Sequence, residues 1–262
     1  MRILFLGDIV GKLGRRACEK LLPKLKKDAK IDLVLANAEN IAHGKGATKA
    51  TIEEVLSYGI DHFTSGNHIF WCKGFDRDIE GLPVLRPANY PPETPGKGYT
   101  VLDLGKSGQV LLINLLGRTF IESSAACPFR EADRILEEFQ GREGVTVVVD
   151  IHGEATSEKV ALGWYLDGRV AAVLGTHTHV PTADAWVMPK GTAYITDVGM
   201  VGARNSVLGV APPIIIDRFI TAVPQRFDWV ENGPAVFNSV LLEVDGNGRA
   251  KSIERIDRVL AG

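Results

Sequence analysis

Five short polar clusters are spaced along this chain, and each directly follows an apolar run with the character of a β-strand. In α/β proteins, the loops after strand ends bear the ligand-binding and catalytic groups. The clusters are far apart in sequence, so only a fold that gathers strand ends at one edge can unite them. They are Gly7-Asp8, Asn37-Ala38-Glu39-Asn40, Gly66-Asn67-His68, Ile151-His152-Gly153-Glu154 and Gly175-Thr176-His177-Thr178-His179.

Four of the six histidines, His68, His152, His177 and His179, fall inside these clusters. Histidine is the commonest protein metal ligand, but two histidines in one polar loop are only a moderate signal. The other clusters add carboxylate and amide side chains, and together they favour a metal site. His43, in a glycine-containing loop, is either in the site but outside the metal shell or only a loop residue.

The two acidic residues in the first two clusters favour metal binding over nucleotide-loop chemistry. Glycines follow Asp8, but their spacing departs from the dinucleotide-binding fingerprint, and a carboxylate would repel phosphate. Asp8 is therefore interpreted as a metal ligand, with helix capping as the alternative. A turn stabilised by asparagine explains Asn37 and Asn40 but not Glu39, whose carboxylate suits a bridge between two metals.

The hydrophobic pattern predicts an α/β architecture. Helices are expected over residues 13–29, 51–58, 128–139 and 157–165. Strands are expected over 2–6, 31–36, 62–65, 99–104, 109–115, 145–151, 170–174, 192–196, 239–244 and 251–256. The turn at 105–108 predicts an antiparallel hairpin, so the sheets should be mixed.

We expect one domain over residues 1–262, with the proline-rich stretch 91–96 as a surface loop. Residues 197–213 are glycine-rich and lack periodicity, which predicts a lid or a subunit contact. Homo-oligomerisation is left open.

Composition narrows the function classes. The 30 Lys and Arg nearly balance the 32 Asp and Glu, so the chain lacks the charge expected of a duplex DNA-binding protein. An anionic substrate would then be attracted locally, by metal ions. The three cysteines form no CxxC pair and are expected to be reduced. No apolar run is long enough for a signal peptide core or a membrane span, so we expect a cytoplasmic protein without membrane partners.

Two of these clusters resemble the motifs of a known family. Gly66-Asn67-His68 and Gly175-Thr176-His177-Thr178-His179 resemble the GNH and GHxH motifs of the calcineurin-like metallophosphoesterases. The chain also resembles the bacterial YmdB-like branch of this superfamily over essentially its whole length. The segments concerned are Gly7-Asp8-Ile9-Val10-Gly11, Asn37-Ala38-Glu39-Asn40, Arg86-Pro87-Ala88-Asn89, residues 152–159 and residues 192–200.

That resemblance implies two packed β-sheets flanked by helices, an αββα sandwich around a dinuclear metal centre. Glu39 would bridge the metals, and His68 would stand beside them without binding. The two implied ligand sets are Asp8, Asn40 and His179 for one metal, and Asn67, His152 and His177 for the other. The chain departs from the wider superfamily in two ways: no histidine follows Asp8 at two residues' distance, and glutamate replaces the usual bridging aspartate.

The donor types, oxygen and imidazole without thiolate, favour Fe or Mn and also suit Zn, as two divalent or mixed-valence ions. We predict a phosphodiesterase in which a metal-bridging hydroxide attacks phosphorus and His68 acts as general acid. The resemblance implies small 2′,3′-cyclic nucleotides as substrates.

Two other functions are considered. One is a regulatory, nucleotide-sensing or RNA-decay-linked protein whose metal site is not primarily catalytic. The other is an amidohydrolase, which would place its HxH motif on an early barrel strand. Trp71, Phe75 and Tyr90 are either core residues or base-stacking residues, and Arg15 and Arg204 are weaker candidates for phosphate contacts.

Overall fold

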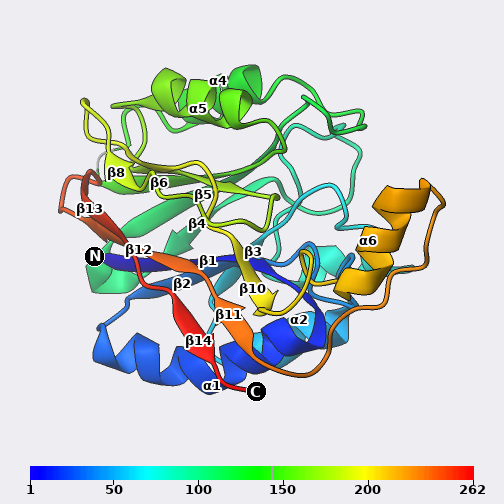
Figure 1. Ribbon diagram of the computed structural model, residues 1–262. Helices are drawn as coiled ribbons and strands as arrows, with labels where there is room; N and C mark the ends of the chain where they lie inside the picture. The colour runs from blue at the N-terminus through cyan, green and yellow to red at the C-terminus, as the bar shows by residue number, and fades with distance from the viewer. Residues whose placement is uncertain (143) are drawn as a thin grey trace.

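Long apolar runs such as those near the N-terminus suit strands that are buried on both faces. In the computed structural model, which describes residues 1–142 and 144–262, these runs belong to two β-sheets stacked face to face (Figure 1). Both sheets combine parallel and antiparallel pairs, and helices cover their outer faces. The predicted architecture of two packed mixed sheets flanked by helices is confirmed.

The first sheet has eight strands: β1 (Arg2–Ile9), β2 (Leu33–Asn37), β3 (His62–Thr64), β10 (Met200–Ala203), β11 (Ala235–Phe237), β12 (Ser239–Val244), β13 (Ala250–Arg255) and β14 (Arg258–Leu260). Its order is β13-β12-β1-β10-β11-β14, with β2 beside β1 and β3 beside β2. β12 and β10 pair with successive halves of β1, β12 antiparallel and β10 parallel.

The second sheet has six strands: β4 (Tyr99–Asp103), β5 (Gln109–Leu116), β6 (Val145–His152), β7 (Ala172–Thr176), β8 (Trp186–Val187) and β9 (Ala193–Ile195). They lie in the order β4-β5-β6-β7-β9-β8. β4 and β5 form the predicted antiparallel hairpin, closed by a short 3-10 turn, η2 (Gly105–Ser107).

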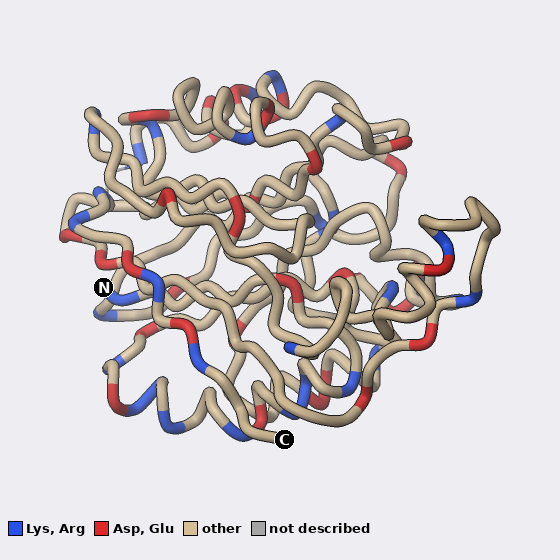
Figure 2. The backbone as a smooth tube through the Cα atoms, in the orientation of Figure 1, with Lys and Arg blue, Asp and Glu red and all other residues tan. Residues whose placement is uncertain are grey.

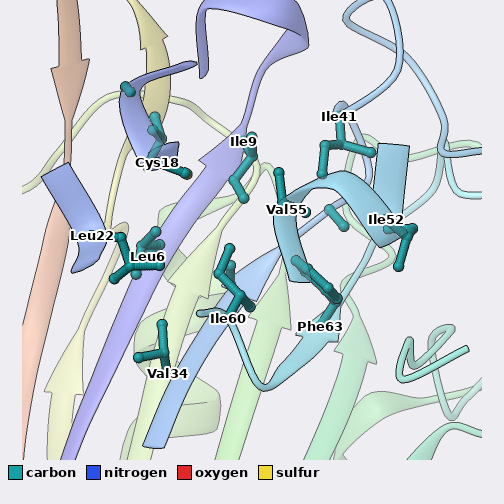
Figure 3. Close-up of a cluster of buried hydrophobic side chains, with 14 of the residues drawn as sticks. Leu6, Ile9, Cys18, Leu22, Val34, Ile41, Ile52, Val55, Ile60 and Phe63 are labelled. Atoms are coloured by element: carbon teal, nitrogen blue, oxygen red, sulfur yellow. The ribbon is translucent and has the colours of Figure 1, made fainter. Parts of the chain in front are cut away.

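The helices are α1 (Gly11–Asp28), α2 (Lys49–Leu56), α3 (Phe75–Asp78), α4 (Pro128–Glu138), α5 (Thr156–Leu166) and α6 (Pro212–Thr221), with a further 3-10 turn, η1 (Ile79–Gly81). α1 and α2 lie below the first sheet, and α4 and α5 above the second (Figure 1). Figure 3 shows the contact between α1 and the first sheet, where Cys18 and Leu22 approach Leu6 and Val34. Cys18 is a free, buried core residue, as predicted.

Successive side chains of a strand point to opposite faces of its sheet, and this alternation divides the core into separate layers. In β1, Leu4 and Leu6 pack with the helices, whereas Ile3 and Phe5 face the second sheet. The core between the sheets also includes Leu35, Leu112, Val148 and Leu174. Burying both faces of β1 in this way explains its unbroken apolar character.

The strand directions bring the polar clusters together. β1, β2, β3 and β10 are mutually parallel, as are β5, β6, β7 and β9. Parallel strands place their carboxyl ends at one edge of a sheet. The loops after β2, β3 and β7 and the last residues of β1 and β6 therefore meet at one end of the sandwich.

Residues 197–213 are predicted to form a lid or a subunit contact, with no strand among them. The segment contains β10, which pairs with β1, and it runs into the start of α6. Strand β10 is only four residues long and includes a glycine, and all four residues are buried. A run this short has no detectable period, so its strand conformation depends on its partners.

The structure bears on two expectations from composition, one about the distribution of charge and one about membrane spans. Figure 2 shows acidic and basic residues intermixed along the backbone. Within the described ranges, no helix is both long and apolar enough to cross a bilayer.

Candidate metal centre

The predicted ligands come from five strand ends. Asp8 lies near the end of β1, Glu39 and Asn40 follow β2, and Asn67 follows β3. His152 is the last residue of β6, and His177 and His179 follow β7. The structure brings these loops together between the two sheets, although 169 residues separate Asp8 from His177 in the sequence.

Glu39 lies at the middle of the cluster and is buried. Its Oε1 accepts from Asn40 Nδ2 at 2.8 Å and is 3.1 Å from His68 Nδ1. Its Oε2 is 3.1 Å from His152 Nε2 and accepts from the His68 backbone N–H at 3.1 Å. Burial alone would raise the pKa of Glu39, but the charges and hydrogen bonds of His152 and His68 outweigh it and lower the pKa. Glu39 is thus an ionised carboxylate with both oxygens directed into the site.

Asp8, Asn40 and His179 form one side of the cluster. Asn40 Nδ2 is 3.0 Å from His179 Nε2, which in turn lies 3.9 Å from Asp8 Oδ1. Asp8 Oδ2 accepts from the backbone N–H of His177 at 3.2 Å. Burial raises the pKa of Asp8, with Glu39 adding to the effect and His152 opposing it. A cation beside Asp8 would offset this unfavourable burial.

His152 and His177 form the other side. Their rings meet edge to face, with His152 Nε2 3.0 Å from His177 Nδ1. Burial opposes charge on His152, but Glu39 and Asp8 overcome it and raise its pKa to about 9. Burial and the charge of His152 lower the pKa of His177 to about 3, so His177 is a neutral imidazole. Ligand atoms of Glu39, His152 and His177 all lie within 4.8 Å of one another, close enough to share one ion.

Two buried oxygens at the site have no hydrogen-bond partner among the described residues: Asp8 Oδ1 and Asn67 Oδ1. An unpaired buried acceptor is costly, and native proteins rarely leave one without a ligand, an ion or water. With two carboxylates and three imidazoles nearby, the donor set fits divalent metal ions.

Backbone geometry supports this role. His177 and His179 have φ values of 101° and 66°, a region that residues other than glycine seldom adopt. Such strain persists where surrounding contacts hold it, and it concentrates at functional sites. Gly66 permits the close approach of its loop, because a Cβ there would overlap Glu39 Oε2 and the His152 ring.

A layer of polar residues beneath the ligands was not identified from the sequence. Asp150 is buried and accepts from Asn37 Nδ2, Thr64 Oγ1 and Thr176 Oγ1. Thr176 Oγ1 is 2.9 Å from His152 Nδ1, which orients the ring and directs Nε2 toward Glu39. Supporting hydrogen bonds of this kind fix the tautomer and orientation of ligating histidines.

A buried ion pair supports the HxH loop. Lys159 Nζ donates to Asp197 Oδ2 at 2.9 Å and to the carbonyl of Thr176 at 3.2 Å. Asp197 Oδ2 also accepts from the backbone N–H of Thr178 at 3.0 Å. Both charged side chains are inaccessible to solvent. Both residues lie in segments on which the family resemblance rests, but only the structure shows that they position residues 176–178.

Of the other residues singled out from the sequence, His68 lies beside the centre and His43 does not. His68 Nδ1 faces Glu39 Oε1 and Asn40 Oδ1, and the His68 ring packs edge-on against Trp71 at 4.8 Å. His43 is exposed and does not line the central cavity, so it is not brought into the site. Phe75 is a core residue. Arg15 is occupied by Glu54 and the carbonyl of Ile41.

A cavity of about 480 Å³ opens over this centre. Its floor includes Glu39, Asn40, His68, His177 and His179. Its outer wall comes from residues 207–229, and several of these residues were missed by sequence reasoning. The missed lining residues are Arg218, Phe219, Phe227 and Trp229, together with Lys45 from outside this segment, whereas Leu208 belongs to the stretch 197–213 predicted to be a lid or a subunit contact.

Residues 4–256 match the family described as YmdB-like protein. The chain belongs to this family. It is 44% identical over 261 residues to the 2′,3′-cyclic-nucleotide 2′-phosphodiesterase of Bacillus subtilis (strain 168), covering 99% of this chain and 97% of that one. The likeness therefore extends over both sheets and every cluster of the candidate centre.

Solved structures agree with this assignment. A Mycoplasma pneumoniae protein described as a novel phosphatase superposes with a TM-score of 0.92 at 35% identity, covering 99% of this chain and 93% of that one. A 5′-nucleotidase precursor from Thermus thermophilus has a TM-score of 0.60 at 15% identity, covering 100% of this chain and 54% of that one. The latter likeness concerns the fold alone.

Proposed function

We propose that this YmdB-like protein is a metal-dependent phosphoric diester hydrolase that opens 2′,3′-cyclic nucleotides. The observation that supports this most strongly is the meeting of carboxylates, imidazoles and two unpartnered buried oxygens at one strand-end edge. The activity named for the Bacillus subtilis relative, at 44% identity over nearly the full length, supports the same substrate class.

In this proposal the donors divide into two sets joined by Glu39. Asp8, Asn40 and His179 would hold one ion, which agrees with their mutual contacts on one side of the cluster. Asn67, His152 and His177 would hold the other, again with Glu39, and His152 and His177 contact each other on the opposite side. Bound divalent ions would supply Lewis acidity, which acidifies water and offsets the phosphate charge. Fe or Mn suit the donors, and Zn is the alternative.

We propose His68 as the residue that transfers a proton. Its Nδ1 faces two acceptors, Glu39 Oε1 and Asn40 Oδ1, so Nδ1 holds a hydrogen and Nε2 is the atom that exchanges a proton with substrate. His68 also lines the cavity. We assign it the role of general acid toward the leaving oxygen.

The reaction adds water to the cyclic phosphorus and breaks the bond from phosphorus to the 2′ oxygen. The 2′ oxygen takes a proton from His68 and becomes a hydroxyl, and the product keeps its phosphate on the 3′ oxygen. The attacking water releases one proton to solvent, and His68 takes up a proton from solvent before the next turnover. The Asn67 amide lies in the loop beside His68, where it can orient a phosphoryl oxygen.

Elemental analysis and turnover test the proposal together. We expect two metal equivalents per chain and conversion of 2′,3′-cyclic AMP to adenosine 3′-monophosphate. Stoichiometric nucleotide binding without product would instead support a sensor. A protein that neither binds metal nor turns over any phosphodiester would exclude the proposed function.

A further inference from the structure

The cavity above the candidate centre has two chemically different ends. Its floor is built from charged and imidazole side chains, and its far wall from apolar ones. Figure 1 shows α6 and the chain that follows it, in orange, along one side of the molecule. The apolar wall residues from this region are Val207, Leu208, Val210, Ile215, Phe219, Phe227 and Trp229. A volume of about 480 Å³ is within the usual range for a small-ligand site.

Contacts with other parts of the chain hold the wall in place. Val210 and Trp229 form an antiparallel bridge, and the backbone N–H of Val230 donates to the carbonyl of Gly209. The indole of Trp229 lies directly against Gly44, where a Cβ would overlap the ring. Leu208 connects the wall to the centre, because its carbonyl is 3.3 Å from His179 Nδ1.

Two cations lie against the same aromatic ring at this wall. Lys45 Nζ is 5.4 Å from the centroid of Phe227, and Arg218 Cζ is 5.3 Å from it. Lys45 Nζ is also 4.4 Å from the Trp71 ring. In the described part of the chain, neither cation has a carboxylate partner within ion-pair distance.

The acidic residues of the cavity lie at its other end. Glu39 belongs to the centre, and Glu154 is engaged by His177, with Oε2 2.9 Å from Nε2. A ligand with one phosphate at the centre would leave Lys45 and Arg218 without an anion. A second phosphate on the same ligand would meet two long, flexible cations that can converge on it.

We propose that the preferred ligand is a nucleoside 2′,3′-cyclic phosphate that has a further phosphate at its 5′ position, as at the 3′ end of a cleaved oligoribonucleotide. The cyclic phosphate occupies the floor, the base packs on the aromatic wall, and the 5′ phosphate lies between Lys45 and Arg218. This inference rests on the proposed function, whose site it extends.

Binding of the reaction products tests the second phosphate site without turnover. We expect calorimetry to show about tenfold tighter binding of adenosine 3′,5′-bisphosphate than of adenosine 3′-monophosphate, a typical gain for charge-assisted contacts. In the Lys45→Ala, Arg218→Ala double variant this ratio should fall to about one. Arg226→Ala is the matched control, since Arg226 is exposed near Phe227 but does not line the cavity, and it should keep the ratio.

Turnover supplies the second measurement. The ratio of kcat/KM for 5′-phosphorylated 2′,3′-cyclic AMP to that for 2′,3′-cyclic AMP should be about ten in the natural protein and about one in the double variant. A dinucleotide ending in a cyclic phosphate, if it is hydrolysed faster still, identifies an RNA end as the source.

The two hypotheses can fail separately. Equal binding of the two products by the natural protein, or an unchanged ratio in the double variant, would overturn the second phosphate site. Absence of all turnover alongside a retained binding preference would overturn the proposed reaction and support the site.

Discussion

Glu39 Oε2 and His152 Nε2 lie 3.1 Å apart, although Glu39 follows a strand of the first sheet and His152 ends a strand of the second. Both side chains are buried. The candidate centre therefore joins the two sheets through these two side chains. Metal binding at this place should stabilise the fold as well as serve catalysis.

The first prediction concerns metal removal. Chelation should lower the melting temperature of the natural protein, because an ion at 1,000 times its Kd contributes about 4 kcal/mol to the free energy of unfolding. In Glu39→Gln, metal content and the effect of chelator should both fall sharply. Calorimetric scans with and without chelator measure this. Glu154→Gln is the control, because Glu154 contacts His177 but is half exposed. Equal losses in both variants would contradict a bridging role for Glu39.

A second prediction separates proton transfer from metal binding at His68. His68→Ala should reduce kcat for 2′,3′-cyclic AMP by about 10² to 10⁴, the usual contribution of a general acid. Metal content should stay at the natural value. A diester with a p-nitrophenolate leaving group needs no protonation, so its hydrolysis should fall far less. Loss of metal in this variant would instead assign His68 to the ligand set.

The buried pair of Lys159 and Asp197 allows a third prediction. Lys159→Met leaves the Asp197 carboxylate buried without its cation, which should cost about 3 to 5 kcal/mol in the free energy of unfolding. Adding Asp197→Asn removes that charge and should recover part of the loss. Urea unfolding of the single and double variants gives the coupling energy. Because the pair positions residues 176–178, metal affinity should also weaken in both variants. If the losses in the free energy of unfolding were simply additive, the two residues would not be energetically paired.

The fourth prediction concerns pH and His62, a buried histidine outside the centre. Burial lowers its pKa from 6.5 to about 4, with a smaller effect from Lys97. Between pH 6.5 and pH 4 the unfolded chain binds a proton at His62 more readily than the folded chain does. The contribution of neutral His62 to the free energy of unfolding is therefore complete above pH 6.5 and is lost as pH falls toward 4.

Replacement by asparagine should remove this dependence and flatten the stability curve between pH 6.5 and 4 by up to about 3 kcal/mol. Asparagine keeps a donor near the Phe63 carbonyl, which lies 3.2 Å from His62 Nδ1. Urea midpoints measured across this range give the answer. Identical slopes for the variant and the natural protein would show that other groups dominate the acid response.

Local sequence was sufficient for most of the architecture. Continuous apolar runs and amphipathic periods predicted β1, α1, α4 and β6 to within a few residues, because these elements bury a face wide enough to leave a period. The strand-end clusters also predicted which residues would meet, since parallel strands direct their carboxyl ends to one edge.

Other features of the protein depend on tertiary structure, because no short-range sequence pattern contains them. β10 is a four-residue strand that exists through its pairing with β1, and Lys159 meets Asp197 across 38 residues. The cavity wall is likewise assembled from Lys45, Arg218 and Phe227, which have no shared motif. A periodic pattern records which face of an element is buried, whereas pairing between distant segments depends on where the folded chain places them.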